Sequence, residues 1–410
     1  MKILLINTFH YHRGGDCTYT FALGDLLKSK GHDVYYWAMR HPKNYNYEYD
    51  NYFVDYIDYN ELNEKRTASN AIKAISRCIY SFHARRKLGE LIEYIRPDVA
   101  HLQSILEYLT PSIIDELKSR NIPVVWTLHH YRLLCPDWHF FRHDKVCEQC
   151  KKYRYYRCII NKCKKKSLAA SFLASVESYS YKLFSIEKKV DCFIAPSKFS
   201  YEKFIEYGWP KKKFCHFYYH LFPFSNLSVE KGKKEDYGLY LGGLFSWKGV
   251  DTLIEACQWI GGFQIRILGD GPIRDKLEKR VEALALKNIR FEGYKRRGEL
   301  EDILGKGSFL VIPSRWYENC PYVIMEAQSY GVPVIGSDIG GIKNLVNDQE
   351  DGLLFEVGNP RDLAAKIRCV IENPKKSRDL GLKARAKAEK EYSPELHYRR
   401  ILDIYERIMQ

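Results

Sequence analysis

Two carboxylates, Glu318 and Glu326, stand eight residues apart in a stretch that could hold a ligand. The apolar run Phe309–Ile312 just before them is typical of a short buried strand. A helix is predicted to open at Pro321, whose fixed φ suits a first helical position, and to stop at Gly331. Glu318 is therefore expected in the loop that leaves the strand, and Glu326 in the second turn of the helix.

A loop that leads from the carboxyl end of a strand into a helix is where open α/β sheets bind ligands, and the first N–H groups of the helix attract phosphate. The carboxylates would accept hydrogen bonds from hydroxyl groups on either side of that phosphate. A nucleotide sugar has this arrangement, because its diphosphate lies between a ribose and a hexose. The spacing alone leaves a second interpretation open, a strand–turn–helix unit with two solvated acids.

A second candidate for anion binding lies at the start of the chain. The apolar run Lys2–Ile6 predicts a buried strand of a parallel sheet, and a helix is predicted over Tyr19–Lys30. Gly14 and Gly15 stand between them, and only glycine lets the backbone approach a phosphate this closely. A plain tight turn would have the same sequence.

Cysteines cluster in the middle of the first half of the chain. Cys147 and Cys150 form a C-x2-C pair, with Cys135 upstream and Cys163 downstream at a spacing of about twelve residues. This is the spacing of a four-thiolate zinc site, which leaves Cys158 as the spare. Loose thiols in a basic loop are the alternative.

Composition indicates an ordinary globular protein. A chain of 410 residues suits two domains, and its 45% hydrophobic and 28% charged residues are typical of soluble proteins. The absence of a secretory signal and of an apolar run long enough to span a bilayer predicts a cytoplasmic protein. The net charge is +14, and residues 142–166 alone contribute +8. This basic segment could bind nucleic acid, anionic lipid or a phosphorylated substrate.

Strands and helices alternate along both halves of the chain, which predicts two doubly wound α/β domains. We expect an N-terminal domain over residues 1–222 with a cysteine-rich insertion at 135–166, a C-terminal domain over 223–393, and a last helix at 394–410 that crosses back to the first domain.

The residues around the two carboxylates resemble the donor-site signature of glycosyltransferase family 4, whose hallmark is the E-x7-E pair. The matching residues are Pro313-Ser314, Glu318, Pro321, Glu326-Ala327, Gly331, Pro333-Val334-Ile335, Ser337 and Gly340-Gly341. The resemblance implies the GT-B fold, in which two Rossmann-like domains face a cleft, and a retaining transfer.

The resemblance also implies roles for single residues. Gly15 would lie beside the acceptor and the donor diphosphate. His129 would lie near the donor hexose, although His130 stands where the family usually has aspartate and Gln103 where it often has histidine. These positions follow strands expected at Pro97–His101 and Pro123–His130.

In the second domain, Lys248 matches the family's diphosphate lysine, whereas Gly243 replaces the companion arginine, for which Arg315 is the nearest substitute. Glu326 would hold the ribose hydroxyls and Glu318 the hexose hydroxyls. The other donor-binding positions carried over from the helix start are Pro321, Tyr322 and Val323.

We therefore expect a retaining hexosyltransferase that uses a nucleotide-diphosphate sugar and a glycan or polyprenyl-diphosphate-linked acceptor, in cell-surface polysaccharide synthesis. His129 and Glu318 are the predicted catalytic pair. No Asp-x-Asp sequence occurs, so we expect no catalytic metal. The +8 segment could bring the protein to the anionic inner face of the membrane.

Two other functions remain open. One is a sugar-nucleotide epimerase or hydrolase on the same fold. The other is a non-catalytic protein that binds nucleic acid through the basic segment, which the donor signature disfavours.

Overall fold

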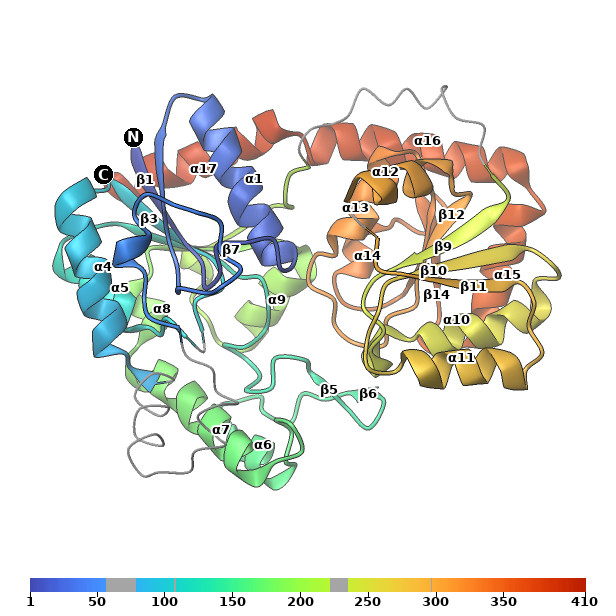
Figure 1. Ribbon diagram of the computed structural model, residues 1–410, viewed down its shortest axis with the longest axis horizontal. Helices are drawn as coiled ribbons and strands as arrows, with labels where there is room; N and C mark the ends of the chain where they lie inside the picture. Colours follow the sequence, from blue (N-terminus) through green and yellow to red (C-terminus); the bar gives the residue numbers. More distant parts are fainter. Residues whose placement is uncertain (57–78, 107, 222–234, 296) are drawn as a thin grey trace. The chain divides into compact units, whose positions relative to one another are not determined.

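The computed structural model describes residues 1–56, 79–106, 108–221, 235–295 and 297–410 (Figure 1). Contacts divide the chain into two compact units. Unit 1 comprises Met1–Phe140, Glu148–Phe217 and Glu395–Gln410, and unit 2 comprises Phe141–Cys147 and Tyr218–Pro394. The boundary expected at residues 222 and 223 falls on a segment outside the described residues.

Unit 1 is built on a six-stranded parallel sheet in the order β2-β1-β3-β4-β7-β8. Its strands are β1 (Lys2–Ile6), β2 (Asp33–Trp37), β3 (Val99–Leu102), β4 (Val124–Thr127), β7 (Cys192–Ala195) and β8 (Phe214–His216). Most of their residues are buried, as expected for a parallel sheet with both faces covered. The strand order reverses between β1 and β3.

The other elements of unit 1 are helices (Figure 1). They are α1 (Gly15–Ser29), α4 (Phe82–Ile95), α5 (Ser112–Ser119), α6 (Tyr156–Ile160), α7 (Leu168–Leu183), α8 (Ile186–Lys189), α9 (Lys198–Glu206) and α17 (Pro394–Met409). Helix α1 starts four residues before the predicted Tyr19, because Gly14 takes the N-cap position and Gly15 is already helical.

The last helix, α17, packs within unit 1 through buried polar contacts. Tyr405 is 0% exposed, and its hydroxyl lies 2.7 Å from His101 Nδ1 on β3. The hydroxyl of Tyr19 on α1 lies 3.0 Å from His397 Nε2. These contacts join α17 to β3 and to α1.

Unit 2 contains a second six-stranded parallel sheet, in the order β11-β10-β9-β12-β13-β14. Its strands are β9 (Tyr237–Leu241), β10 (Gln264–Leu268), β11 (Ile289–Gly293), β12 (Phe309–Ile312), β13 (Val334–Ser337) and β14 (Gly352–Phe355). Counted within the unit, this is the 3-2-1-4-5-6 order of a Rossmann sheet, and its switch point lies between β9 and β12.

The helices of unit 2 are α10 (Val250–Ala256), α11 (Arg274–Ala283), α12 (Arg297–Lys306), α13 (Tyr322–Ser329), α14 (Ile342–Leu345), α15 (Pro360–Ile371) and α16 (Pro374–Glu391). Helix α10 begins at Val250, and Gly249 takes its N-cap position with a left-handed φ of +68°. A short hairpin, β5 (Phe141–Arg142) with β6 (Lys145–Val146), is grouped with this unit.

Two parallel, doubly wound sheets confirm the predicted α/β fold class. Within the described ranges, no helix combines the length and the apolar character that a bilayer span requires.

Candidate functional site

Two loops meet at the switch point of unit 2. The first follows β9 and carries Lys248 in a 3₁₀ turn, and the second follows β12 and carries Glu318. Lys248 Nζ lies 2.7 Å from Glu318 Oε1, and the same oxygen accepts a hydrogen bond from the Ser314 hydroxyl at 2.7 Å. The Glu318 side chain is 8% exposed and the Lys248 side chain 24%. The structure therefore brings together two residues that the sequence analysis singled out separately.

Arg315 joins the same two loops through side chain and backbone. Its Nη2 donates to both carboxylate oxygens of Asp251, at 2.9 and 3.0 Å, and to the Ser246 carbonyl at 2.7 Å. Its backbone N–H donates to the Trp247 carbonyl at 2.8 Å. Arg315 thus positions the Lys248 loop, and its part as the substitute for the missing arginine stays a prediction.

Glycines allow the backbones at this junction to approach closely. A Cβ on Gly249 would lie 1.9 Å from the Pro313 carbonyl oxygen, and a Cβ on Gly341 would lie 1.7 Å from that of Asn319. The Gly341 N–H also donates to the Glu318 carbonyl at 2.7 Å. Any larger residue at these two positions would displace the loop that holds Glu318.

The helix after this loop differs slightly from the prediction. Helix α13 begins at Tyr322, with Pro321 as its extended N-cap, and ends before Gly331, whose φ is +63°. Glu326 lies in its second turn, as expected, and is partly exposed. The Tyr322 ring stacks on Tyr219, with centroids 4.9 Å apart, so that its side chain packs against the protein. Tyr322 and Val323 start the helix, where backbone N–H groups are available to an anion.

In unit 1, the predicted residues again follow neighbouring strands. Gly15 is exposed at the first position of α1, beyond β1. His129 follows β4, and its Nε2 donates to Gln103 Oε1 at 2.8 Å. Gln103 follows β3, so the residue that replaces the family's usual histidine is the partner of His129.

Burial keeps both histidines at this edge of the sheet neutral. It lowers the pKa of His129 to about 3, because the protein replaces the water that would solvate the charged ring. The pKa of His101, which also contacts the Thr127 hydroxyl at 2.7 Å, falls to about 3, chiefly for the same reason. A neutral His129 can take part in hydrogen bonds without carrying charge.

A buried ion pair supports the loop after His129. Arg132 Nη2 lies 2.6 Å from Glu177 Oε2 on α7, and the two side chains are 7% and 3% exposed. The Tyr181 hydroxyl also donates to Glu177. Removing either charge would leave the other buried without its counterion, which costs several kcal/mol in typical proteins. Sequence reasoning missed this pair because no local spacing connects its members.

The cysteines of the basic segment are only partly grouped. Cys150 and Cys158 are buried together with Tyr155, and Cys163 packs against them. The Cys158 thiol interacts with Cys163, whereas the spacing had suggested Cys158 as the spare. Among the residues that the structure describes, no three His, Cys, Asp or Glu side chains are placed to hold a metal ion. Zinc binding by Cys135, Cys147, Cys150 and Cys163 stays a prediction.

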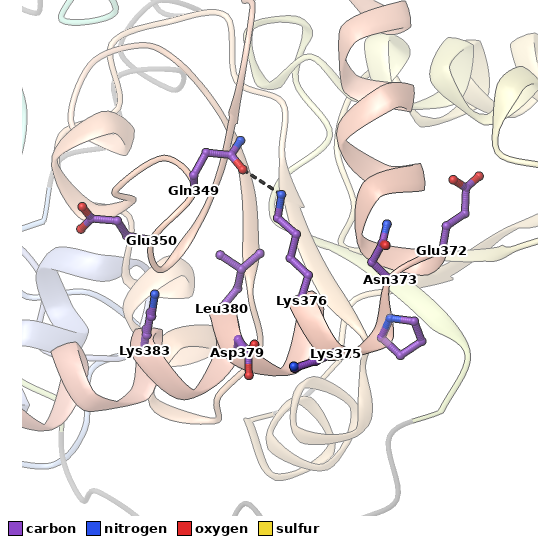
Figure 2. A pocket seen from close by; sticks show the side chains of 10 residues that line it. Gln349, Glu350, Glu372, Asn373, Lys375, Lys376, Asp379, Leu380 and Lys383 are labelled. Carbon is purple, nitrogen blue, oxygen red and sulfur yellow. Dashed lines mark hydrogen bonds between the residues drawn. The ribbon is translucent and has the colours of Figure 1, made fainter.

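A shallow hollow of about 560 Å³ lies elsewhere in unit 2, at the junction of α15 and α16 (Figure 2). Acidic and basic side chains alternate around it, including Glu372, Asp379 and Lys383. None of the predicted site residues lines it, and its mixed charge favours no particular ligand. We therefore assign the site to the strand ends and not to this hollow.

Comparisons with known proteins agree with the observed fold. The family model described as Glycosyltransferase Family 4 matches residues 13–218, half of the chain, and the model described as Glycosyl transferases group 1 matches residues 225–387. A structure of HepE from Anabaena in complex with UDP-glucose superposes with a TM-score of 0.63 at 17% identity, covering 100% of this chain and 98% of that one. Together with the two Rossmann-type sheets, this defines the GT-B class. The chain belongs to glycosyltransferase family 4.

Two curated relatives match part of the chain. An uncharacterized glycosyltransferase of Methanocaldococcus jannaschii is 38% identical over 146 residues, which are 36% of this chain and 41% of the relative. The amylovoran biosynthesis glycosyltransferase AmsK of Erwinia amylovora is 29% identical over 171 residues, 39% of this chain and 42% of the relative. The matched regions thus span about two fifths of each relative.

We expect the stability of the fold to fall in mild acid because of His101. Its pKa is about 3 in the folded chain against an ordinary value of 6.5, so below pH 6.5 the unfolded chain takes up a proton that the folded chain does not. The free energy of unfolding should therefore decrease as the pH falls from 6.5 toward 3, by about 2 kcal/mol for one imidazole at pH 5. Urea denaturation at pH 7 and pH 5 measures this.

The variant His101→Gln should show a smaller loss between the two pH values than the wild type. Thr127→Val removes a hydrogen bond to the same ring but keeps the imidazole, so it should retain the wild-type dependence. Equal losses in His101→Gln and the wild type would contradict the assignment.

Metal analysis tests the zinc prediction. If the four predicted thiolates bind zinc, freshly purified protein should contain about one zinc ion per chain, and Cys150→Ser should lose it. Cys158→Ser should keep it. If Cys158→Ser loses zinc and Cys147→Ser keeps it, Cys158 is a ligand in place of Cys147. If the wild type contains no zinc, the predicted site is refuted.

Proposed function

We propose that this chain is a retaining glycosyltransferase that moves a hexose from a nucleotide-diphosphate sugar to a glycan or polyprenyl-diphosphate-linked acceptor. The observation that carries the proposal is the Lys248–Glu318 pair at the switch point of unit 2. A cation and a hydroxyl-binding carboxylate are held there beside the start of α13, as a donor with a diphosphate and a hexose requires.

Each residue has a distinct part in the proposal. Lys248 offsets the charge of the diphosphate together with the N–H groups at the start of α13, so that no catalytic metal is needed. Glu326 accepts hydrogen bonds from the ribose and Glu318 from the hexose. Gly15 and the neutral His129 act on the side of unit 1, where His129 binds the hexose without carrying charge.

The proposed reaction retains the configuration of the sugar. The bond between the anomeric carbon and the diphosphate oxygen breaks while the acceptor oxygen attacks from the same face, and the leaving phosphate takes the acceptor proton. No protein nucleophile is required. Family membership supports the transfer, and the UDP-glucose complex of HepE and the amylovoran role of AmsK support a nucleotide-sugar donor and a polysaccharide product.

Substitution of the two carboxylates tests the assignment of the donor. Charge-assisted hydrogen bonds to ribose are worth roughly 1.5–3 kcal/mol, so Glu326→Ala should weaken nucleotide binding by about tenfold to a hundredfold in calorimetry. Glu318→Gln should instead lower turnover of the sugar nucleotide more than binding of the free nucleotide. Because the base is unknown, a panel of nucleotides is screened first by thermal shift.

Glu372→Ala is a matched control, because this exposed carboxylate lines the hollow at α15 and α16. It should bind nucleotide as the wild type does. Equal nucleotide affinity in Glu326→Ala and the wild type would refute the ribose contact. Labelled donor then separates a transferase, which needs an acceptor and keeps the anomeric configuration, from an epimerase or hydrolase, which needs none.

We also propose that the chain binds its acceptor at the anionic inner face of the cell membrane. The net charge of +8 in residues 142–166 supports this location.

A further inference from the structure

Helix α7 buries polar side chains and exposes apolar ones, the reverse of an ordinary surface helix. Its buried residues are Ser171, Ala174, Ser175, Glu177, Ser178, Ser180 and Tyr181. In contrast, Leu168 and Phe172 are each 56% exposed, Tyr179 is 41% and Leu183 is 80% exposed. These four residues recur at intervals of four and seven, so they share one face of the helix.

The buried polar face has its partners inside unit 1. Ser175 Oγ donates to the carbonyl of Tyr155, just before α6, at 2.9 Å, and the Lys164 N–H donates to Ser171 Oγ at 3.0 Å. Figure 1 shows α6 beside α7, and the two helices are in contact. The serines therefore pack toward α6, while Glu177 pairs with Arg132 as described above. Tyr179 also packs toward α6, because its hydroxyl accepts the Tyr156 N–H at 3.3 Å and its ring centroid lies 5.1 Å from that of Tyr155. Leu168, Phe172 and Leu183 remain exposed.

Basic residues adjoin the exposed apolar side chains. Lys162, Lys165 and Lys166 are exposed immediately before α7, and Ile160 at the end of α6 is 63% exposed. Exposed apolar patches on soluble chains mark contact surfaces, and apolar side chains beside lysines are typical of helices that lie in the headgroup region of a bilayer.

We propose that α7 docks this surface on an anionic lipid bilayer. The docking face is defined as Leu168, Phe172 and Leu183 together with Lys162, Lys165 and Lys166. Its apolar side chains enter the boundary between headgroups and acyl chains, and its lysines contact lipid phosphates. The charge of residues 142–166 complements an anionic surface and repels a second copy of the same segment.

This inference rests on the proposed membrane location of the acceptor and deepens it. A basic segment alone would be held by charge and released by salt. The docking face adds an apolar contribution, which salt does not screen. The two contributions can be separated by substitution because they come from different side chains.

Flotation of the full chain with lipid vesicles tests the docking face. The wild type should bind vesicles that mix phosphatidylglycerol with phosphatidylcholine, bind phosphatidylcholine alone much less, and stay partly bound when salt is raised. The variant Leu168→Ser/Phe172→Ser should bind at least about tenfold more weakly and lose the salt-resistant part. Lys165→Gln/Lys166→Gln should bind about tenfold more weakly at low salt.

Two controls match these variants in chemistry. Leu382→Ser removes an apolar side chain that is 46% exposed on α16, and Lys211→Gln/Lys212→Gln removes the same charge from exposed positions of unit 1. Both should bind vesicles as the wild type does. Because all the substituted positions are on the surface, the fold should be retained, and circular dichroism checks this.

Three results would overturn the proposal. The first is a wild type that ignores phosphatidylglycerol vesicles at low salt, and the second is unchanged binding by Leu168→Ser/Phe172→Ser. The third is a wild-type dimer in sedimentation velocity that Phe172→Ser dissociates, which would assign the face to a second copy. Nucleotide binding is measured on the same samples, so a chain that binds nucleotide but not vesicles disproves the docking face and leaves the proposed function standing.

Discussion

The contact between Lys248 and Glu318 is the constraint on which the candidate site depends. Both side chains lose water at the junction, and an ion pair in that setting is favourable only when the remaining polar atoms are also satisfied. Ser314 supplies one such bond to the carboxylate, and the Trp316 ring lies 5.3 Å from the lysine nitrogen. The lysine is therefore held in place before any substrate arrives, which would lower the entropic cost of binding the proposed diphosphate there.

This contact in turn requires the two loops to touch. Arg315 joins them with hydrogen bonds to Asp251 and to backbone carbonyls, and Gly249 and Gly341 allow backbone approach that a side chain would block. The arginine and the glycines thus determine the position of Glu318, although none of them needs to touch a substrate. Substitutions at these positions would act on the site through the loop.

Whereas an ion pair holds Lys248 and Glu318 in unit 2, burial lowers the pKa of the histidines near the strand ends of unit 1. Both histidines near its strand ends are neutral, and His129 is oriented by the amide of Gln103, which does not titrate. The hydrogen bond between His129 and Gln103 therefore persists over a wide pH range. The Arg132–Glu177 pair links this histidine loop to α7, so the helix that presents the docking face also supports the loop after His129.

The sequence by itself determined the class of fold, the type of most elements and the candidate residues. Strands Lys2–Ile6 and Phe309–Ile312 have the predicted bounds, because a buried parallel strand is a continuous apolar run. The last helix starts at Pro394 as predicted, because a proline suits the first position of a helix. The start of the helix predicted from Tyr19 moved by four residues, because Gly14 takes the N-cap position.

Only the tertiary structure decided which residues meet. Lys248 and Glu318 are seventy positions apart in the chain, and they touch because the 3-2-1-4-5-6 strand order makes β9 and β12 neighbours. The contact between the Cys158 and Cys163 thiols and the exposed apolar face of α7 likewise could not be predicted from the sequence. Periodicity shows that a helix has two different faces, but which face is covered depends on what packs against it, and that is set by contacts between segments distant in the chain.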